Sequence, residues 1–226
     1  MMRSFFSQSR AFIRVDMRKT PVNFLRRYTN LPSLFDILQN QRITLLDPST
    51  WDDKNDSFFM EKYKDKKGLK TLLGLCFTEK GETYHHWKVF SSGSSGVCVV
   101  FKKDELLQYV KNISGTKCNQ VSYKRIKQIK DSPPTISEMP FIKRLPYQDE
   151  KEFRIIYEHK ITIKNHKQIS IKLDSIEKIT LSPWTPEQLI QPVRQAIKNI
   201  ADIPVLKTTL LSNEQWKNIG NQIKSV

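Results

Sequence analysis

Hydrophobic positions along this chain fall in short runs separated by polar segments, a pattern typical of strands joined by short helices and loops. Residues 72–78 and 97–101 are almost entirely apolar and predict two buried strands. Further strands are predicted where β-branched and aromatic residues recur, at residues 23–28, 42–46, 119–123, 152–157, 161–173 and 178–181. The chain should therefore build a sheet from many short strands.

Helices are expected mainly before and after this group of strands. Asn30 precedes an early helical proline, Pro32, so residues 33–40 are predicted to form a capped helix. A lysine-rich amphipathic stretch ends near residue 70, and residues 83–90 form a short helix or turn before a flexible loop at 91–96. The predicted class is α+β, with mixed, mainly antiparallel central sheets flanked by helices.

The chain shows no internal repeat and no low-complexity linker. Residues 1–20 are interpreted as an N-terminal extension, and residues 21–226 as a single α+β domain with a helical C-terminal segment. No apolar run approaches the roughly 20 residues needed to cross a bilayer. The odd cysteine count predicts buried free thiols in a reducing cytoplasm, at Cys76, Cys98 and Cys118. We therefore expect a cytoplasmic protein with no membrane partner; its oligomeric state has no sequence signal.

The formal net charge of +15 indicates an anionic partner, such as a nucleic acid or a nucleotide. The lysines are spread along the chain, and lysine also accumulates on ordinary solvated surfaces in proteins from low-GC genomes. Sequence-independent attraction to phosphates is therefore favoured over a dedicated nucleic-acid reader.

The most informative segment is the charged start of the strand at residues 152–157. Side chains on a strand alternate between its two faces, so Glu150, Glu152 and Arg154 are predicted to lie on one face. Three charged groups on one face suit a site that binds a sugar or stabilises developing positive charge. The alternative is an exposed strand face whose charges are solvated.

Two other segments carry candidate binding groups. Arg26, Arg27 and Tyr28 end the first strand just before a helix, where a guanidinium can bind a phosphate with two hydrogen bonds. The alternative is a surface ion pair and a core tyrosine. The acids of residues 51–56 resemble part of a cation site, but they lack the calcium-loop spacing, so capping of the local turns is favoured and no metal is predicted.

The segment at residues 83–90 contains two adjacent histidines and an aromatic pair. His85 and His86 point in different directions on a helix, so they cannot share a metal, although one of them can act as a general acid or contact a substrate. Trp87 offers a flat face, and the glycine-serine loop at 91–96 can approach a heterocycle and its phosphate closely. The alternative is a core tryptophan beneath an ordinary loop.

The order of these segments resembles the bacterial family known as domain of unknown function 2971, over residues 23–184. The resemblance is carried by several short motifs in succession: Arg27-Tyr28, Asn30-Leu31, residues 47–56, Cys76-Phe77-Thr78-Glu79, Trp87 with Gly96-Val97-Cys98, and Glu150-Lys151-Glu152-Phe153-Arg154. Residues 51–56 depart from the usual Asn-Asp-Pro-Phe pattern, so a different local turn is expected there.

A second resemblance is to the ADP-ribosyltransferases, in which an arginine strand, a middle strand ending in Ser or Thr and a late Glu-x-Glu strand follow one another. It implies NAD as the substrate. Arg27 would bind the dinucleotide phosphates or ribose with Tyr28 nearby, although the assignment of Arg27 over Arg26 depends on register, and Thr78 would occupy the middle-strand position. Glu152 would hold the ribose 2′-hydroxyl and stabilise the oxocarbenium ion. Glu150 would position the acceptor.

The sequence thus favours an enzyme that transfers ADP-ribose from NAD to a macromolecular acceptor, a nucleic acid or a protein. Trp87 would contact the cofactor, and Arg154 would bind it or pair with Glu152 and keep that carboxylate ionised. Two alternatives remain open. One is a non-catalytic, basic nucleic-acid-binding or phage-defence module, and the other is a hydrolase that uses Glu150 and Glu152.

Overall fold

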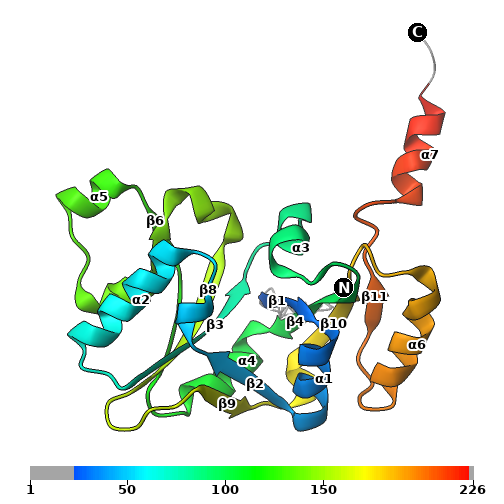
Figure 1. The fold of residues 1–226 in the computed structure, drawn as a ribbon. Coiled ribbons are helices and arrows are strands. Elements are labelled where there is room, and N and C mark those ends of the chain that lie inside the picture. The colour runs from blue at the N-terminus through cyan, green and yellow to red at the C-terminus, as the bar shows by residue number, and fades with distance from the viewer. Residues whose placement is uncertain (1–22, 224–226) are drawn as a thin grey trace, which may run out of the picture.

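The computed structural model describes residues 23–223, in which one large sheet is flanked by helices (Figure 1). The main path of this sheet follows the order β11-β10-β4-β1-β3-β2-β9, and β8 pairs with both β3 and β5. All its pairings are antiparallel except that of β10 with β11. Its strands are β1 (Phe24–Asn30), β2 (Arg42–Leu46), β3 (Thr71–Thr78), β4 (Gly96–Lys102), β5 (Thr116–Gln120), β8 (Glu152–His159), β9 (His166–Ser170), β10 (Ile176–Leu181) and β11 (Val205–Lys207).

The chain also forms seven helices within the described residues, and several of them cover the sheet (Figure 1). They are α1 (Leu31–Asn40), α2 (Lys54–Lys66), α3 (Tyr84–Phe90), α4 (Lys103–Lys111), α5 (Ile126–Asp131), α6 (Glu187–Lys198) and α7 (Glu214–Gln222). Short 3-10 turns are η1 (Pro48–Thr50), η2 (Gly93–Ser95), η3 (Ile136–Phe141), η4 (Leu145–Glu150) and η5 (Leu173–Ser175). A separate parallel pair joins β6 (Ser122–Lys124) and β7 (Ile142–Arg144).

The sheet forks at β3, and this fork positions the site. One edge of β3 pairs with β8 along the whole strand, from Thr71 to Thr78. The opposite edge meets two strands at single points, because Gly74 pairs with Leu46 of β2 and Thr78 pairs with Arg26 of β1. Residues 75–77 have no strand partner on this edge. The strands β1 and β2 therefore diverge from each other along this edge of β3. A space opens between β1 and the unpaired residues 75–77 of β3.

The hydrophobic core lies in three clusters around this fork. The largest fills the space beneath α1, α4 and α6 with residues such as Leu34, Leu106 and Ile190. A second packs α2 and η3 against the other face of β3 and β8 through Met60, Tyr63 and Ile156. The third lies under α3 and contains Tyr28, Trp87, Cys98 and Val100. Each cluster removes apolar surface from water, and together they hold the diverging strands in place.

The structure confirms the predicted α+β class and most of the predicted strands. Asn30 caps α1 by accepting a hydrogen bond from Ser33 N at 2.9 Å, and Asp53 caps α2, as expected of an Asx turn. The apolar runs form the buried strands β3 and β4. The alternating strands β1, β2, β8 and β10 begin within two residues of their predicted starts.

Four local predictions differ from the structure. The strand expected at 119–123 is two strands separated at Val121, and within 161–173 only His166–Ser170 forms a strand, with Ile161 and Ile163 exposed. The helices α4 and α5 lie among the strands, where no helix was predicted. Of the free cysteines, Cys98 is buried, whereas Cys76 and Cys118 are partly exposed.

Helix α7 extends away from the rest of the molecule and contains no buried residue (Figure 1). The predicted extension at residues 1–20 lies outside the described residues. Within residues 23–223, no helix combines the length and the apolar character that crossing a membrane requires.

Candidate functional site

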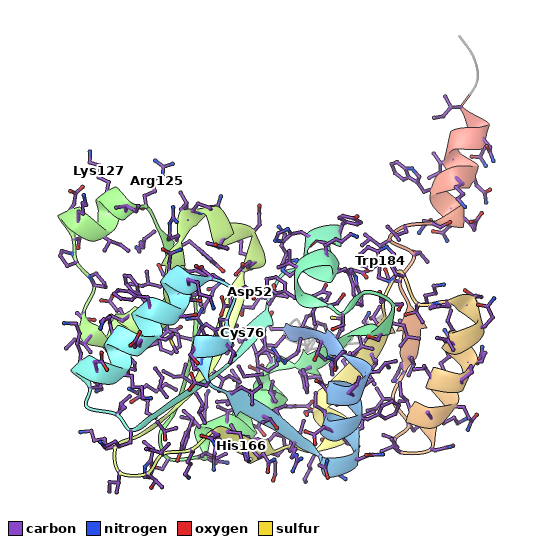
Figure 2. The ribbon with its side chains drawn as sticks, viewed as in Figure 1. Asp52, Cys76, Arg125, Lys127, His166 and Trp184 are labelled. Atoms are coloured by element: carbon purple, nitrogen blue, oxygen red, sulfur yellow. The ribbon has the colours of Figure 1, made fainter. Side chains whose placement is uncertain are left out.

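A cavity of about 510 Å³ occupies the space where β1 and β3 diverge. It reaches from the end of β1 across the unpaired edge of β3 to the start of β8, and α3 closes one side. Cys76 of β3 and Asp52 at the start of α2 lie near the middle of the molecule in Figure 2, and both line this cavity. Of the predicted site residues, Arg27, Tyr28, Thr78, Glu150 and Glu152 line it; Trp87 and Arg154 do not.

Arg27 lies across the gap in the sheet. Its Nη1 donates a hydrogen bond of 2.9 Å to the carbonyl oxygen of Cys76, in the part of β3 that has no strand partner on this edge. No carboxylate among the described residues pairs with this guanidinium, and burial lowers the pKa of Arg27. A partly desolvated cation without a counter-ion at a cavity wall attracts an anionic group of a ligand.

Arg26 also lines the cavity, although it leaves the opposite face of β1 from Arg27. Its Nη1 donates to the carbonyl oxygens of Glu79 at 3.4 Å and Lys80 at 3.2 Å, just beyond the end of β3. Arg26 therefore supports the chain after β3, whereas Arg27 points into the gap.

The acidic end of the cavity is organised by Lys143 of β7. Its Nζ lies 2.7 Å from Glu150 Oε2 and 3.4 Å from Glu152 Oε2. Glu150 belongs to η4 rather than to the strand, because Lys151 adopts a left-handed conformation with a φ of 46° and the strand begins at Glu152. The predicted single face holding Glu150, Glu152 and Arg154 is therefore corrected, and Lys143 brings the two glutamates together instead.

Behind Glu152 lies a fully buried ion-pair network. Arg154 has 0% of its surface exposed. Its Nε donates to Glu152 Oε1 at 2.8 Å, and its Nη1 and Nη2 donate to the two carboxylate oxygens of Asp56 at 3.0 and 2.7 Å. Arg154 thus contacts Glu152 and leaves no face for a ligand, which corrects its prediction as a cofactor-binding residue.

These cations determine which acid is ionised. Burial alone would raise the pKa of Glu152, but Arg154 and Lys143 outweigh burial and hold that pKa at about 2. The balance is opposite at Glu150, whose pKa is raised by burial even though Lys143 lies beside it. Burial also raises the pKa of Asp56. Glu152 is therefore a permanent carboxylate at the cavity wall, whereas Glu150 gains a proton more readily.

Thr78 and Cys76 bring β3 to the acidic end of the cavity. The hydroxyl of Thr78 donates to the carbonyl oxygen of Glu150 and accepts from Lys80 N, so it fixes η4 against β3. The thiol of Cys76 lies beside Glu152, and burial raises its pKa well above the ordinary range, which keeps it protonated. Both residues act on the neighbouring glutamates, and neither is activated as a nucleophile.

The aromatic wall of the cavity is Trp51. Its indole ring packs over Gly74, where a Cβ atom would approach Trp51 Cζ2 to 2.8 Å, so only glycine leaves room for the ring. The Arg154 guanidinium carbon lies 4.6 Å from the centroid of the same indole. Trp51 therefore connects the network behind Glu152 with the unpaired edge of β3.

Trp87 is not the wall that was predicted. It is only 1% exposed, its Nε1 donates to Glu82 at 2.6 Å, and its ring packs edge-on against Tyr28 at 5.0 Å. A tryptophan on the inner face of a short amphipathic helix packs under that helix instead of facing a ligand. The loop at 91–96 does not line the cavity either. The helix α3 does contribute, through His86, Val89 and Phe90.

His86 is held as a neutral ring. Its Nδ1 lies 2.6 Å from Thr83 Oγ1 and its Nε2 lies 3.2 Å from the carbonyl oxygen of Glu150, which can only accept a hydrogen bond. Nε2 therefore carries the proton and Nδ1 accepts from Thr83. Burial lowers the pKa of His86, in agreement with a neutral ring. His86 fixes η4 against α3 instead of serving as a general acid.

Sequence reasoning missed Lys143, Asp56 and the role of Trp51. A basic residue on a three-residue strand gives no periodic signal, and Asp56 looked like part of a capped loop because Asp53 is three residues before it. The acids of residues 51–56 were the available signal, since both Trp51 and Asp56 lie in that segment. Within residues 23–223, no group of three His, Cys, Asp or Glu side chains is placed to hold a metal ion.

Comparisons with known proteins leave the family open. No family model matches the chain, so the resemblance to domain of unknown function 2971 is not confirmed. No curated protein matches it in sequence. Among solved structures, the chain is similar to "Thermus sp. 2.9 DarT in complex with carba-NAD+", with a TM-score of 0.42 and 8% identity over 85% of this chain and 98% of that chain. A similarity at this level carries no argument about function.

Proposed function

We propose that this protein transfers ADP-ribose from NAD to a macromolecular acceptor. The observation that carries the proposal is the pairing of opposite charges across one cavity: Arg27, without a carboxylate partner among residues 23–223, at one side and the ionised Glu152 at the other. NAD has the matching polarity, because its diphosphate is anionic and its nicotinamide riboside is cationic.

The cavity size and lining fit the larger part of such a ligand. A volume of about 510 Å³ lies within the range of small-molecule sites. Apolar and aromatic walls formed by Trp51, Leu75, Phe77 and Phe90 suit a flat heterocycle between the two charged ends.

The chemical step that we propose breaks the glycosidic bond between the ribose C1′ and the nicotinamide nitrogen. The electron pair leaves with nicotinamide, which becomes neutral, and positive charge develops on the ribose. Glu152 stabilises this charge, and Glu150 positions the acceptor, whose nucleophile attacks C1′ and loses its proton to water. Because Glu152 stays ionised, its charge is in place before the bond breaks.

The direct test is to incubate the purified protein with labelled NAD and with protein, DNA or RNA as acceptor. We expect release of nicotinamide and transfer of the label to one of these acceptors. Release of nicotinamide with free ADP-ribose as the sole other product would indicate a hydrolase. If no condition releases nicotinamide, the enzyme proposal is wrong.

Arg27→Gln should weaken NAD binding by about tenfold to a hundredfold, since a charge-assisted hydrogen bond to phosphate contributes about 1.5–3 kcal/mol. The melting temperature should change little, because within the described part of the chain the buried guanidinium has a single hydrogen bond, to the Cys76 carbonyl. Isothermal titration calorimetry measures the affinity. Arg42→Gln is the control, because Arg42 pairs with Asp36 outside the cavity. Equal affinities for wild type and Arg27→Gln would contradict the phosphate role.

A second candidate function, binding of nucleic acid, is favoured by the basic segment at residues 122–130. It contains Lys124, Arg125, Lys127 and Lys130 and no acidic residue. Figure 2 shows Arg125 and Lys127 projecting outward at the end of α5. A neighbouring groove of about 300 Å³ is lined by Ile126, Ile129 and Arg144, among others. This surface suits an acceptor strand or a nucleic acid that is bound without reaction.

We expect RNA or DNA to bind with low micromolar or weaker affinity and with a steep salt dependence. Replacing Arg125 and Lys127 by Glu should reduce the slope of log K against log salt by about 2. The matched control replaces Lys198 and Lys217 by Glu, because they lie on α6 and α7, away from α5 (Figure 1). Fluorescence anisotropy at several salt concentrations measures both. Equal slopes for the two double variants would mean that α5 is not the binding surface.

A further inference from the structure

Lys143 presents a conflict within the acidic end of the cavity. If Glu152 is to stabilise a cation in a ligand, one of its oxygens has to be available. Oε1 is bound by the buried Arg154 at 2.8 Å, and Oε2 lies 3.4 Å from the Lys143 ammonium. In this structure a lysine of the protein therefore stands where the ligand's positive charge would have to lie.

The geometry shows which of these contacts can be released. Lys143 is closer to Glu150 Oε2, at 2.7 Å, than to Glu152, and Asp56 Oδ2 lies 3.9 Å away on a third side. The side chain of Lys143 retains 9% exposure, whereas that of Arg154 has none. The ammonium can move fully onto Glu150 and Asp56 without losing all its partners. Arg154 has no comparable alternative, because it is enclosed by Glu152, Asp56 and the carbonyl oxygen of Pro140.

The charge count supports the same conclusion. Three carboxyl groups, Asp56, Glu150 and Glu152, are joined through two cations, Lys143 and Arg154. When all three carboxyl groups are ionised, the cluster is one positive charge short of balance. The other groups that face the cluster add no full charge. The Tyr147 ring lies 4.8 Å from Lys143 Nζ, and the Tyr123 hydroxyl accepts a hydrogen bond of 2.8 Å from Glu152 N. The thiol of Cys76 and the ring of His86 are both neutral.

We infer that Lys143 is a displaceable counter-ion that limits the preference of this cavity for a cationic ligand group over a neutral one of the same shape. When the cation enters, the Lys143 ammonium leaves Glu152 Oε2 and stays with Glu150 and Asp56. This inference rests on the proposed function, because it identifies the nicotinamide ring as that group. It makes Lys143 a specificity-determining residue of the cavity, beside Glu152.

The test compares NAD with NADH, whose nicotinamide ring is neutral, in wild type, Lys143→Met and Lys143→Arg. Removal of the competing ammonium should raise the ratio of the NADH to the NAD dissociation constant by about tenfold, which corresponds to about 1.4 kcal/mol. Lys143→Arg keeps the charge and should return the ratio close to that of wild type. Lys80→Met is the matched control: it removes the same charge at a residue that pairs with Asp149 and does not line the cavity.

A pH series separates this role from a structural one. Without Lys143, Glu150 takes up a proton more readily, because the ammonium that opposes the effect of burial is gone. The preference of Lys143→Met for NAD should therefore be smaller at pH about 5 than at pH about 8, and the wild-type preference should vary less. A change in packing alone would not produce this difference.

The corresponding ratio for the isolated ring is measured by NMR, as the dissociation constant of the neutral nicotinamide divided by that of the cationic 1-methylnicotinamide. A preference for the cation that grows in Lys143→Met, in a protein that never cleaves NAD, would support the inference while the transferase proposal fails. Three results would overturn the inference. Lys143→Met could fold and keep the wild-type ratio of dissociation constants, Lys80→Met could change that ratio as much as Lys143→Met does, or no variant could prefer the cation. Should Lys143→Met fail to fold, a crystal structure of wild type with 1-methylnicotinamide decides: an ammonium still on Glu152 Oε2 overturns the inference.

Discussion

Glu152→Gln is expected to reduce the rate of nicotinamide release by about a hundredfold to a thousandfold, the usual cost of losing one charged stabiliser of a transition state. The amide keeps nearly the same shape, so the cavity should be retained, but NAD should bind more weakly because the carboxylate that faces its cationic ring has gone. High-performance liquid chromatography of nicotinamide at saturating NAD measures the rate. A variant as active as wild type would exclude Glu152 from the chemistry.

Stability serves as the internal control for this variant. The amide oxygen can still accept from Arg154 Nε, and Asp56 still binds the other two guanidinium nitrogens, so Glu152→Gln should lower the free energy of unfolding by about 1–3 kcal/mol. Glu150→Gln is the matched comparison, because Glu150 faces the same lysine but does not contact Arg154. It should slow acceptor-dependent transfer more than nicotinamide release, since its proposed role concerns the acceptor.

The pH dependence follows from the same contacts. The pKa of Glu152 is held at about 2, below its ordinary value near 4.3. The stabilisation that comes from its ionised form is therefore fully present above pH about 5 and is lost as pH falls toward 2. A loss of activity at higher pH than this would have to come from a group whose pKa is raised by burial, and Glu150 and Asp56 are the candidates.

The sequence predicted the frame of this fold because its strands carry strong local signals. The strands β3 and β4 are continuous apolar runs, and the α1 cap is set by Asn30 and Pro32 within a few residues. Helix α4 was missed although Leu106, Leu107 and Val110 give it an apolar face, and α5 was missed because six residues are too few to show a helical period. Local patterning thus indicated most of the strands in their order along the chain, but not the helices α4 and α5 between them.

Only part of the site could be predicted, because only some of its charged residues are close together in the sequence. Glu150, Glu152 and Arg154 are close in sequence, so alternation along a strand was enough to suggest that their charges converge. Lys143 and Asp56 reach the same place from β7 and α2, and Asp56 is separated from Arg154 by 98 residues. A local sequence pattern cannot predict a contact between residues that are so far apart in the chain. Trp87 illustrates the opposite error, because an aromatic residue beside a flexible loop looked like a binding wall but packs beneath Tyr28.

Arg154→Met should produce the largest loss of stability of any substitution considered, about 3–5 kcal/mol. The reason is that it leaves Glu152 and Asp56 buried without the guanidinium that binds them both. Methionine fills similar volume, so a cavity contributes little to the effect. Urea unfolding followed by circular dichroism measures it. A loss below about 1 kcal/mol would mean that the carboxylates find other partners or take up protons at little cost.

A double-mutant cycle tests whether the loss comes from the uncompensated charge. Asp56→Leu combined with Arg154→Met removes one acid with the cation, and Lys143 then remains beside Glu152. The double variant should therefore be more stable than Arg154→Met alone, by about 1–3 kcal/mol, because one buried carboxylate has gone. The losses in free energy of unfolding from Asp56→Leu and Arg154→Met could instead add in the double variant. The network would then contribute through packing against Trp51 and Met60. The ionised state of Glu152 would not depend on the pair of Asp56 and Arg154.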